Sequence, residues 1–185
     1  MNTRRVPVVG FCAWSGTGKT TLLVRLLPLL VAKGFRVAVV KRAHHKLDID
    51  HPGKDSYELR KAGASQMLIS SGKRMALITE LEDGRDEPSL TDALDCLNLQ
   101  NLDLILVEGY KRGTHEKIEL HRAELKKPLF FPGDPSVIAI ASDAPIPELR
   151  GRLPRLDLND PEQIAQFIVD RFVGIPSTSV ARDRP

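Results

Sequence analysis

The sequence predicts an α/β fold, a three-layer sandwich in which helices flank a mostly parallel β-sheet, with an added antiparallel hairpin. Two observations support this fold class. The first is a series of compact apolar runs of the buried-strand type. The second is a stretch with helical spacing between the first two runs, so the chain begins with the order strand, loop, helix, strand. That order implies parallel strands joined by a right-handed crossover.

The opening strand–helix–strand unit has clear boundaries. VPVVGFCA (6–13) is typical of a buried strand, and FRVAVVKR (35–42) is typical of a second one. Pro28 lies inside the intervening helix and should kink it or remove one hydrogen bond, and Gly34 should end it. The apolar positions of that helix recur every three or four residues: Leu22, Leu23, Leu26, Leu27, Leu30 and Val31.

The middle of the chain is more polar. A polar loop (43–55) leads into a short predicted helix (55–64). SQMLISSGKRMALITEL (65–81) predicts two strands joined at SSGK, and a charged loop (82–89) and a short helix (90–97) follow. An isolated hairpin is marginally stable. We therefore expect the rest of the chain or a partner subunit to cover it.

Three further strands and a closing helix complete the predicted fold. Strands are expected at 102–112 and 135–145, and at 117–122 as an edge strand because KIELHR alternates between polar and apolar residues. The closing amphipathic helix spans 160–172 and has Asp160 as its N-cap.

Composition indicates one globular domain. The chain has 185 residues, of which 42% are hydrophobic, and we assign the domain to residues 1–174 and a disordered tail to 175–185. The net charge is only +3, with basic residues spread among acids, which argues against nucleic-acid and membrane binding. No segment is long enough to span a bilayer, and Cys12 and Cys96 share no metal-ligand spacing. We expect a cytoplasmic protein with reduced thiols.

A glycine-rich loop follows the first strand. Residues 13–20, AWSGTGKT, match the phosphate-binding pattern G-x-x-x-x-G-K-[ST], except that Ala13 replaces the first glycine. That glycine mainly permits the turn out of the strand, so alanine is compatible with the site. The loop's other glycines let backbone amides point at phosphate oxygens, and the next helix offers free N-terminal amides. The sequence thus predicts a P-loop NTPase whose nucleotide contacts are Ser15, Gly16, Thr17, Gly18, Lys19, Thr20 and Thr21.

Catalytic and metal-binding roles are assigned around this loop. Lys19 is expected to act on the terminal phosphates, and the Thr20 hydroxyl to bind Mg²⁺. Glu108 closes the apolar run LILVE, and at the carboxyl edge of a parallel sheet it would face the ligand crevice. Glu108 is therefore expected to be a catalytic carboxylate that holds Mg²⁺. Gly109 would let the chain turn and let a phosphate come close.

The loop after the second strand offers further candidates. Lys41 is the first charge after that strand and is expected to reach phosphates. His44 and His45 are adjacent and diverge in an extended segment, so joint metal ligation is not expected. The acids of this loop are candidates for contact with Mg²⁺, with Asp48 as the assigned ligand: Asp48, Asp50 and Asp55.

Four segments together resemble the MobB family of molybdopterin-guanine dinucleotide biosynthesis adaptor proteins: FCAWSGTGKTTLL, KRAHHKLDIDHPGKDSYELRKAGA, LDLILVEGYK and VIAIASD. HPGKDSYELRKAGA with LVEGYK is far more specific than the loop, which many nucleotide-binding proteins share. The resemblance covers about residues 6–172. It implies a homodimeric protein that binds GTP and Mg²⁺ and hydrolyses GTP weakly. It also implies a role beside the MobA nucleotidyltransferase, with molybdopterin-handling proteins, molybdopterin or its guanine dinucleotide as further partners.

The resemblance also bears on the nucleotide base. Asp143, in ASDAP, lies where related NTPases place residues near the base, so it is a predicted nucleotide contact. The segment lacks the Asn-Lys-x-Asp pattern of Ras-like GTPases. Guanine preference is therefore implied by the family and not by a readable motif.

The sequence offers few catalytic helpers. It shows no obvious glutamine to orient water and no clear arginine finger, a group that can contribute about 10³–10⁵-fold in rate. We expect at most a slow Mg²⁺-dependent GTPase, which favours an adaptor over a metabolic enzyme. Two alternatives stay open. One is a P-loop small-molecule kinase or ligase whose acceptor is bound by the 43–55 loop, and the other is a scaffold that binds nucleotide without hydrolysing it.

Overall fold

The computed structural model describes residues 6–43, 50–81 and 87–174. The chain gathers into two compact units, one made of Met1–Arg42 and Leu97–Pro185 and the other of Ala43–Cys96. Each unit contains its own β-sheet. The assignment of one domain to residues 1–174 and of a disordered tail to 175–185 stays a prediction.

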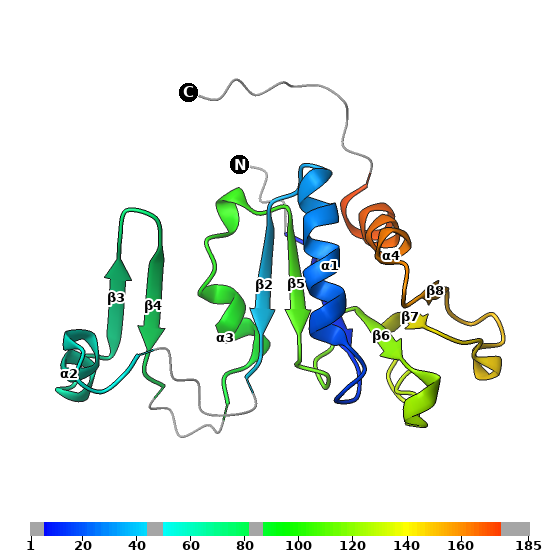
Figure 1. The fold of residues 1–185 in the computed structure, drawn as a ribbon, viewed down its shortest axis with the longest axis horizontal. Coiled ribbons are helices and arrows are strands. Elements are labelled where there is room, and N and C mark those ends of the chain that lie inside the picture. The colour runs from blue at the N-terminus through cyan, green and yellow to red at the C-terminus, as the bar shows by residue number, and fades with distance from the viewer. Residues whose placement is uncertain (1–5, 44–49, 82–86, 175–185) are drawn as a thin grey trace. The chain divides into compact units, whose positions relative to one another are not determined.

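The first unit is built on a six-stranded sheet with the order β2-β5-β1-β6-β7-β8, in which neighbouring strands run parallel (Figure 1). Its strands are β1 (Val8–Cys12), β2 (Val37–Lys41), β5 (Leu104–Glu108), β6 (Lys117–His121), β7 (Val137–Ser142) and β8 (Arg155–Asp157). Its helices are α1 (Lys19–Ala32) and α4 (Pro161–Ile168), which continues into a π-helical turn, Val169–Val173. Short 3₁₀ turns occupy Leu99–Asn101, Ala123–Leu125 and Pro147–Leu149. The predicted α/β fold is confirmed.

Helix α1 forms where the apolar spacing predicts it. It continues through Pro28 as one helix, and Gly34 lies just beyond its end with a φ of 88°. Both α1 and α4 lie on the same face of the sheet (Figure 1), where they contact each other. The buried side chains of α1 face the main core: Leu22, Leu23, Leu26 and Leu30. Among the described residues, no helix is long and apolar enough to cross a membrane.

Alternation along the central strands divides the apolar residues between two cores. Val9 and Phe11 of β1 pack into the core beneath α1 and α4. Cys12 points to the opposite face, where it joins a smaller cluster with Phe131 and Ile140. This division follows from the two-residue period of a strand, in which successive side chains point to opposite faces of the sheet. Polar groups can then occupy the carboxyl ends of the strands.

The strand at 117–121 is not the edge strand that the sequence predicts. β6 lies between β1 and β7, and Lys117 and Glu119 are buried. The Lys117 ammonium lies 3.3 Å from an Asp134 carboxylate oxygen and also donates to the Ser136 hydroxyl. The Glu119 carboxylate accepts from the backbone amides of Phe130 and Phe131 at 2.8 and 2.9 Å. The alternation was misleading because loop partners satisfy these charges inside the protein. Strand β8 was not predicted.

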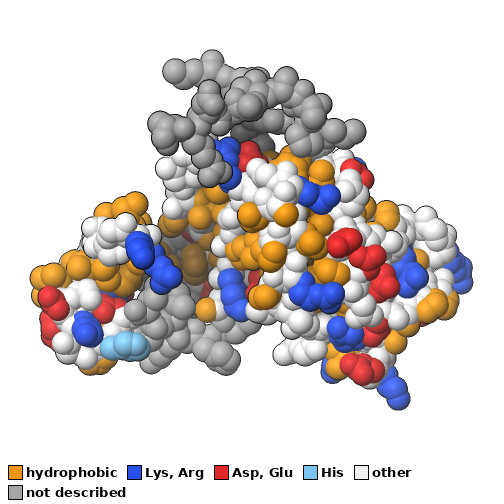
Figure 2. Space-filling model, turned by 45° about the horizontal axis from the view of Figure 1, so that its top comes forward, with side chains coloured by type: hydrophobic (Ala, Val, Ile, Leu, Met, Phe, Trp, Pro, Cys, Tyr) orange, Lys and Arg blue, Asp and Glu red, His pale blue; other side chains and the backbone are white. Residues whose placement is uncertain are grey.

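The second unit contains α2 (Asp55–Lys61), the antiparallel pair β3 (Gln66–Ser70) and β4 (Met75–Thr79), and α3 (Leu90–Asp95). The predicted hairpin is confirmed. Figure 2 shows apolar side chains gathered on this unit, at the left of the view. Leu68 and Leu77 are cross-strand partners, and with Met75 they share one face and are 58%, 48% and 76% exposed.

Candidate functional site

The loop between β1 and α1 requires glycine at two positions. Gly16 and Gly18 have φ values of 82° and 97°, in the left-handed region that L side chains rarely adopt. A Cβ at Gly16 would meet nothing within 4 Å, so the backbone torsion alone requires glycine there. Ala13 is not among the described residues with positive φ. Alanine therefore fits the position where the phosphate-binding pattern has its first glycine.

The N-terminus of α1 is open at the end of this loop. Gly18 is the N-cap, and no described side chain caps the first turn of this 14-residue helix. The first backbone N–H groups of a helix lack partners within the helix, and the helix dipole places about half a positive charge there. An anion at this position would satisfy both.

Lys19 folds back across the loop. Its ammonium donates to the carbonyls of Ala13 and Trp14 at 3.3 and 3.4 Å. Partial burial lowers the pKa of Lys19 from its ordinary value, while the nearby Glu108 carboxylate acts in the opposite direction. The two carbonyls leave one ammonium proton for a third acceptor.

Strand pairing brings a carboxylate to the start of α1. Lys41 of β2 and Glu108 of β5 are register partners, with Lys41 Nζ 3.4 Å from Glu108 Oε2. The Thr20 hydroxyl donates to Glu108 Oε1 at 3.0 Å. The structure thus brings together three of the predicted site residues from three different elements.

The Thr20–Glu108 pair fits the donor set of Mg²⁺. This ion prefers oxygen ligands, and proteins usually hold it by one or two side chains while water and phosphate complete the shell. Within the described ranges, no group of three or more His, Cys, Asp or Glu residues is arranged to hold a metal. A hydroxyl and a carboxylate oxygen 3.0 Å apart at a helix N-terminus therefore suit an ion that arrives with a nucleotide.

The backbone conformation after β5 requires glycine at position 109. Its φ is 103°, and a Cβ there would lie 2.8 Å from the Cβ of Arg42. Gly109 therefore allows the chain to turn directly after Glu108 while it passes the end of β2.

Arg122 is a further residue of the site, which no sequence motif indicates. It follows β6, and its Nε donates to the Thr17 carbonyl of the glycine-rich loop at 3.0 Å. Its Nη1 donates to Asp143 at 3.3 Å, and Asp143 also accepts from the Ala123 amide at 3.0 Å. The end of β6 thus joins the loop to the end of β7. Recognition of β6 as an interior strand would have pointed to Arg122, because ligands bind beyond the carboxyl ends of such strands.

The remaining predicted residues lie in different surroundings. Thr17 is buried, and its hydroxyl donates to the Trp14 carbonyl at 2.8 Å, so its side chain braces the loop. Ser15 and Thr21 are exposed. Asp48, like His44 and His45, lies outside the described residues. Asp50, named as a possible Mg²⁺ contact, accepts hydrogen bonds from Ser56 and Arg60 within the second unit.

Comparison with curated relatives gives close matches. An adapter protein of molybdopterin-guanine dinucleotide biosynthesis from Escherichia coli (strain K12) is 47% identical over 166 residues, which cover 89% of this chain and 93% of the relative. The protein with the same name from Haemophilus influenzae is 41% identical over 165 residues, covering 89% of this chain and 88% of the relative.

Solved structures and a family model agree with these relatives. A crystal structure of molybdopterin-guanine biosynthesis protein B superimposes with a TM-score of 0.65 at 25% identity, over 88% of this chain and 98% of that one. Bacillus subtilis MobB has the same fold, with a TM-score of 0.66 at 23% identity over 91% and 99% of the two chains. The family described as molybdopterin guanine dinucleotide synthesis protein B matches residues 8–143. With its glycine-rich loop, Thr20–Glu108 pair and parallel sheet, the chain belongs to the MobB family.

Proposed function

We propose that this chain is a GTP-binding adapter with weak GTPase activity in molybdopterin-guanine dinucleotide biosynthesis, where it assists the MobA nucleotidyltransferase or delivers the cofactor. Membership of the MobB family supports the pathway. The hydrogen bond between Thr20 at the start of α1 and Glu108 at the end of β5 is the observation that carries the nucleotide-dependent part. It joins the phosphate-binding loop to an acidic strand end, as a Mg²⁺-nucleotide site requires.

The chemistry of the loop supports a triphosphate ligand. Free amides of the first turn of α1, the Lys19 ammonium and the glycine-rich backbone all present positive charge to one region. Mg²⁺, held by Thr20 and Glu108, would neutralise charge on the phosphates. Guanine preference is supported by the family resemblance.

Weak hydrolysis follows from the groups around this loop. The segment after Glu108, GYKRGTHEK, contains no glutamine that could orient an attacking water. The Arg122 guanidinium is held by the Thr17 carbonyl and Asp143. Positioning of water and charge supplies most of the catalysis in phosphoryl transfer. We therefore propose slow turnover unless a partner supplies the missing groups.

The test is nucleotide competition followed by turnover. GTP should displace a fluorescent GTP analogue at lower concentration than ATP does, and GDP should compete as well. GTP turnover is then measured alone, with molybdopterin, and with molybdopterin and purified MobA. Stimulation that requires MobA supports the adapter, whereas phosphate transferred to a small acceptor in the absence of MobA would favour the kinase or ligase alternative.

We also propose a homodimer in the cytoplasm. The apolar hairpin face of Leu68, Met75 and Leu77 supports the dimer, because a second copy could cover it.

The cytoplasmic location is supported by two free cysteines. Burial, followed by the nearby Glu119 carboxylate, raises the pKa of the Cys12 thiol to about 12, which keeps it protonated and unreactive.

A further inference from the structure

A fixed pair of aromatic rings adjoins the glycine-rich loop. The rings of Trp14 and Phe130 stack with their centroids 5.1 Å apart and their planes inclined by 21°. The Trp14 indole N–H donates to the Pro128 carbonyl at 2.8 Å, which holds the ring in place. Both side chains are only partly buried. The pair therefore offers a rigid, accessible aromatic surface.

The ammonium groups of two lysines lie over these rings. Lys111 Nζ lies 5.6 Å from the Trp14 ring centroid and 6.0 Å from that of Phe130, and Lys127 Nζ lies 5.7 Å from Trp14. Both lysines are exposed, and neither forms a salt bridge within the part of the chain that the structure describes. Their charge is therefore available to an anionic ligand.

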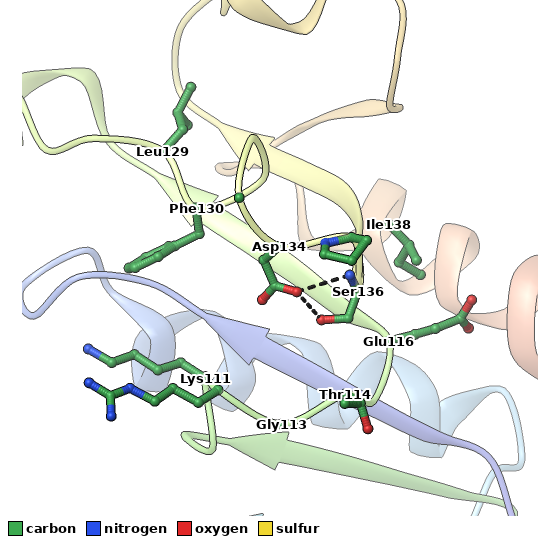
Figure 3. A pocket seen from close by; sticks show the side chains of 12 residues that line it. Lys111, Gly113, Thr114, Glu116, Leu129, Phe130, Asp134, Ser136 and Ile138 are labelled. Atoms are coloured by element: carbon green, nitrogen blue, oxygen red, sulfur yellow. Dashed lines mark hydrogen bonds between the residues drawn. The ribbon is translucent and has the colours of Figure 1, made fainter.

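A cavity of about 920 Å³ opens beside Phe130 and Lys111, with Arg112 also in its wall. Its two acids are already paired: Asp134 with Lys117 at 3.3 Å, and Glu116 with Arg171 at 2.6 Å. Figure 3 shows Lys111 and Phe130 at one end of the cavity and Glu116 at the other. The aromatic end of the cavity is therefore its positively charged end.

The position of Trp14 relates this surface to the loop. The Trp14 carbonyl accepts a hydrogen bond from the Lys19 ammonium. In phosphate-binding loops this lysine reaches the terminal phosphates of the nucleotide. The backbone of Trp14 thus lies in the part of the loop nearest the terminal phosphates of the proposed nucleotide.

We propose that Trp14, Phe130, Lys111, Arg112 and Lys127 form a second ligand site, for a planar heteroaromatic ring that carries a phosphate group. The ring stacks on the aromatic pair, and the lysines and Arg112 bind its phosphate. This proposal rests on the proposed function in one respect: the second site lies beside a nucleotide only if the glycine-rich loop binds one. A phosphorylated pterin and a purine nucleotide both combine a planar heteroaromatic ring with a phosphate group.

Trp14 provides the readout, because it is the only tryptophan of the chain. The full-length protein is titrated with 6-hydroxymethylpterin monophosphate and, separately, with GMP, and the Trp14 emission is followed. Each titration is run without and with a saturating non-hydrolysable GTP analogue and Mg²⁺. Quenching by a phosphorylated ring in both conditions is expected, and the relative affinities of the two probes identify the preferred ring. Unphosphorylated 6-hydroxymethylpterin should bind at least about tenfold more weakly, since it lacks a charge-assisted contact.

Variants separate the two halves of the site. Phe130→Leu keeps an apolar side chain but removes the ring, and should weaken binding roughly 5- to 150-fold, the range that base stacking on an aromatic side chain contributes. Lys111→Ala should weaken binding of the phosphorylated probes about tenfold and that of the unphosphorylated ring much less. Lys33→Ala, about 20 Å away at the other end of α1, is the matched control and should bind as wild type does.

Three results would overturn the second site: no quenching by either phosphorylated ring, wild-type affinity in both variants, or competitive displacement of the phosphorylated pterin by the GTP analogue. Failure of the GTP analogue itself to bind would contradict the proposed nucleotide function. That failure would leave ring binding by Trp14 and Phe130 intact, so the two claims fail separately.

Discussion

At the scale of single residues, Glu108 links the parts of the proposed nucleotide site. One of its oxygens accepts from Thr20, and the other lies 3.4 Å from the Lys41 ammonium. The Glu108 side chain is only 12% exposed, whereas that of Lys41 is 57% exposed. The ion pair itself should thus add little stability, and the value of Glu108 lies in the oxygen that it presents beside Thr20.

Glu108→Gln should reduce Mg²⁺-dependent GTP hydrolysis by about tenfold or more, because a neutral amide is a poorer ligand for a hard cation. GTP affinity should change much less, since the loop amides and Lys19 remain. Single-turnover hydrolysis and equilibrium binding measure the two effects separately. A variant that hydrolyses GTP at the wild-type rate would remove Glu108 from the metal shell.

His115 should make the protein less stable in acid. Neither ring nitrogen has a hydrogen-bond partner among the described residues. Burial and then the Lys117 charge lower the pKa of His115 from 6.5 to about 4. Between these values the unfolded chain binds more protons than the folded one, so the free energy of unfolding falls as the pH drops from about 6.5 towards 4.

His115→Gln removes this titration and should flatten the acid side of the stability curve, as measured by urea unfolding at several pH values. His51→Gln, at an exposed histidine, is the control. An acid dependence in His115→Gln as steep as in wild type would show that His115 is not responsible.

At the scale of secondary-structure elements, the turn after β5 depends on Gly109. Gly109→Ala should cost about 1–3 kcal/mol, because alanine is strained at a φ of 103° and its Cβ would lie 2.8 Å from Arg42 Cβ. Gly72→Ala, in the β3–β4 turn, is a matched control, since a Cβ there meets nothing within 4 Å. Its unfolding free energy should stay within about 1 kcal/mol of wild type. Equal stability of the two variants would contradict this view of the turn.

Elements with apolar patterns could be predicted from sequence, and those with buried charges could not. The opening β1–α1–β2 unit and the hairpin were predicted because their apolar spacing and glycines follow local rules. β6 was predicted at the wrong place in the sheet because Lys117 and Glu119 resemble exposed residues. Their partners include groups in the loop 130–136, after the strand.

The residues of the candidate site also divide into those that a local pattern predicts and those that it does not. Lys19, Thr20 and Glu108 were predicted from a motif and a strand end, and the structure places them together. Arg122 and Phe130 were not predicted as part of it. Arg122 and Thr17 are 105 positions apart in the sequence, and Trp14 and Pro128 are 114 positions apart, so no local pattern predicts either hydrogen bond.

At the scale of the whole molecule, the exposed hairpin face predicts assembly. Leu77→Lys should weaken the proposed dimer by about tenfold or more, because burial of a leucine side chain contributes about 1.5–3 kcal/mol. Val24→Lys is the control, since Val24 is an exposed apolar residue of α1, outside the hairpin. Sedimentation equilibrium gives the dissociation constants. A Leu77→Lys variant that dimerises as tightly as wild type would place the interface elsewhere.

Binding of GTP by the loop at residues 13–21 can be measured by calorimetric titration of wild type and Lys19→Ala with GTP and Mg²⁺. We expect wild type to bind GTP and Lys19→Ala to bind it at least about tenfold more weakly, because a charged hydrogen bond to phosphate is lost. The melting temperature should change little, since among the described residues the hydrogen bonds of the Lys19 ammonium go to two loop carbonyls. Wild-type affinity in Lys19→Ala, or no GTP binding by the folded wild-type protein, would show that this loop is not a GTP site.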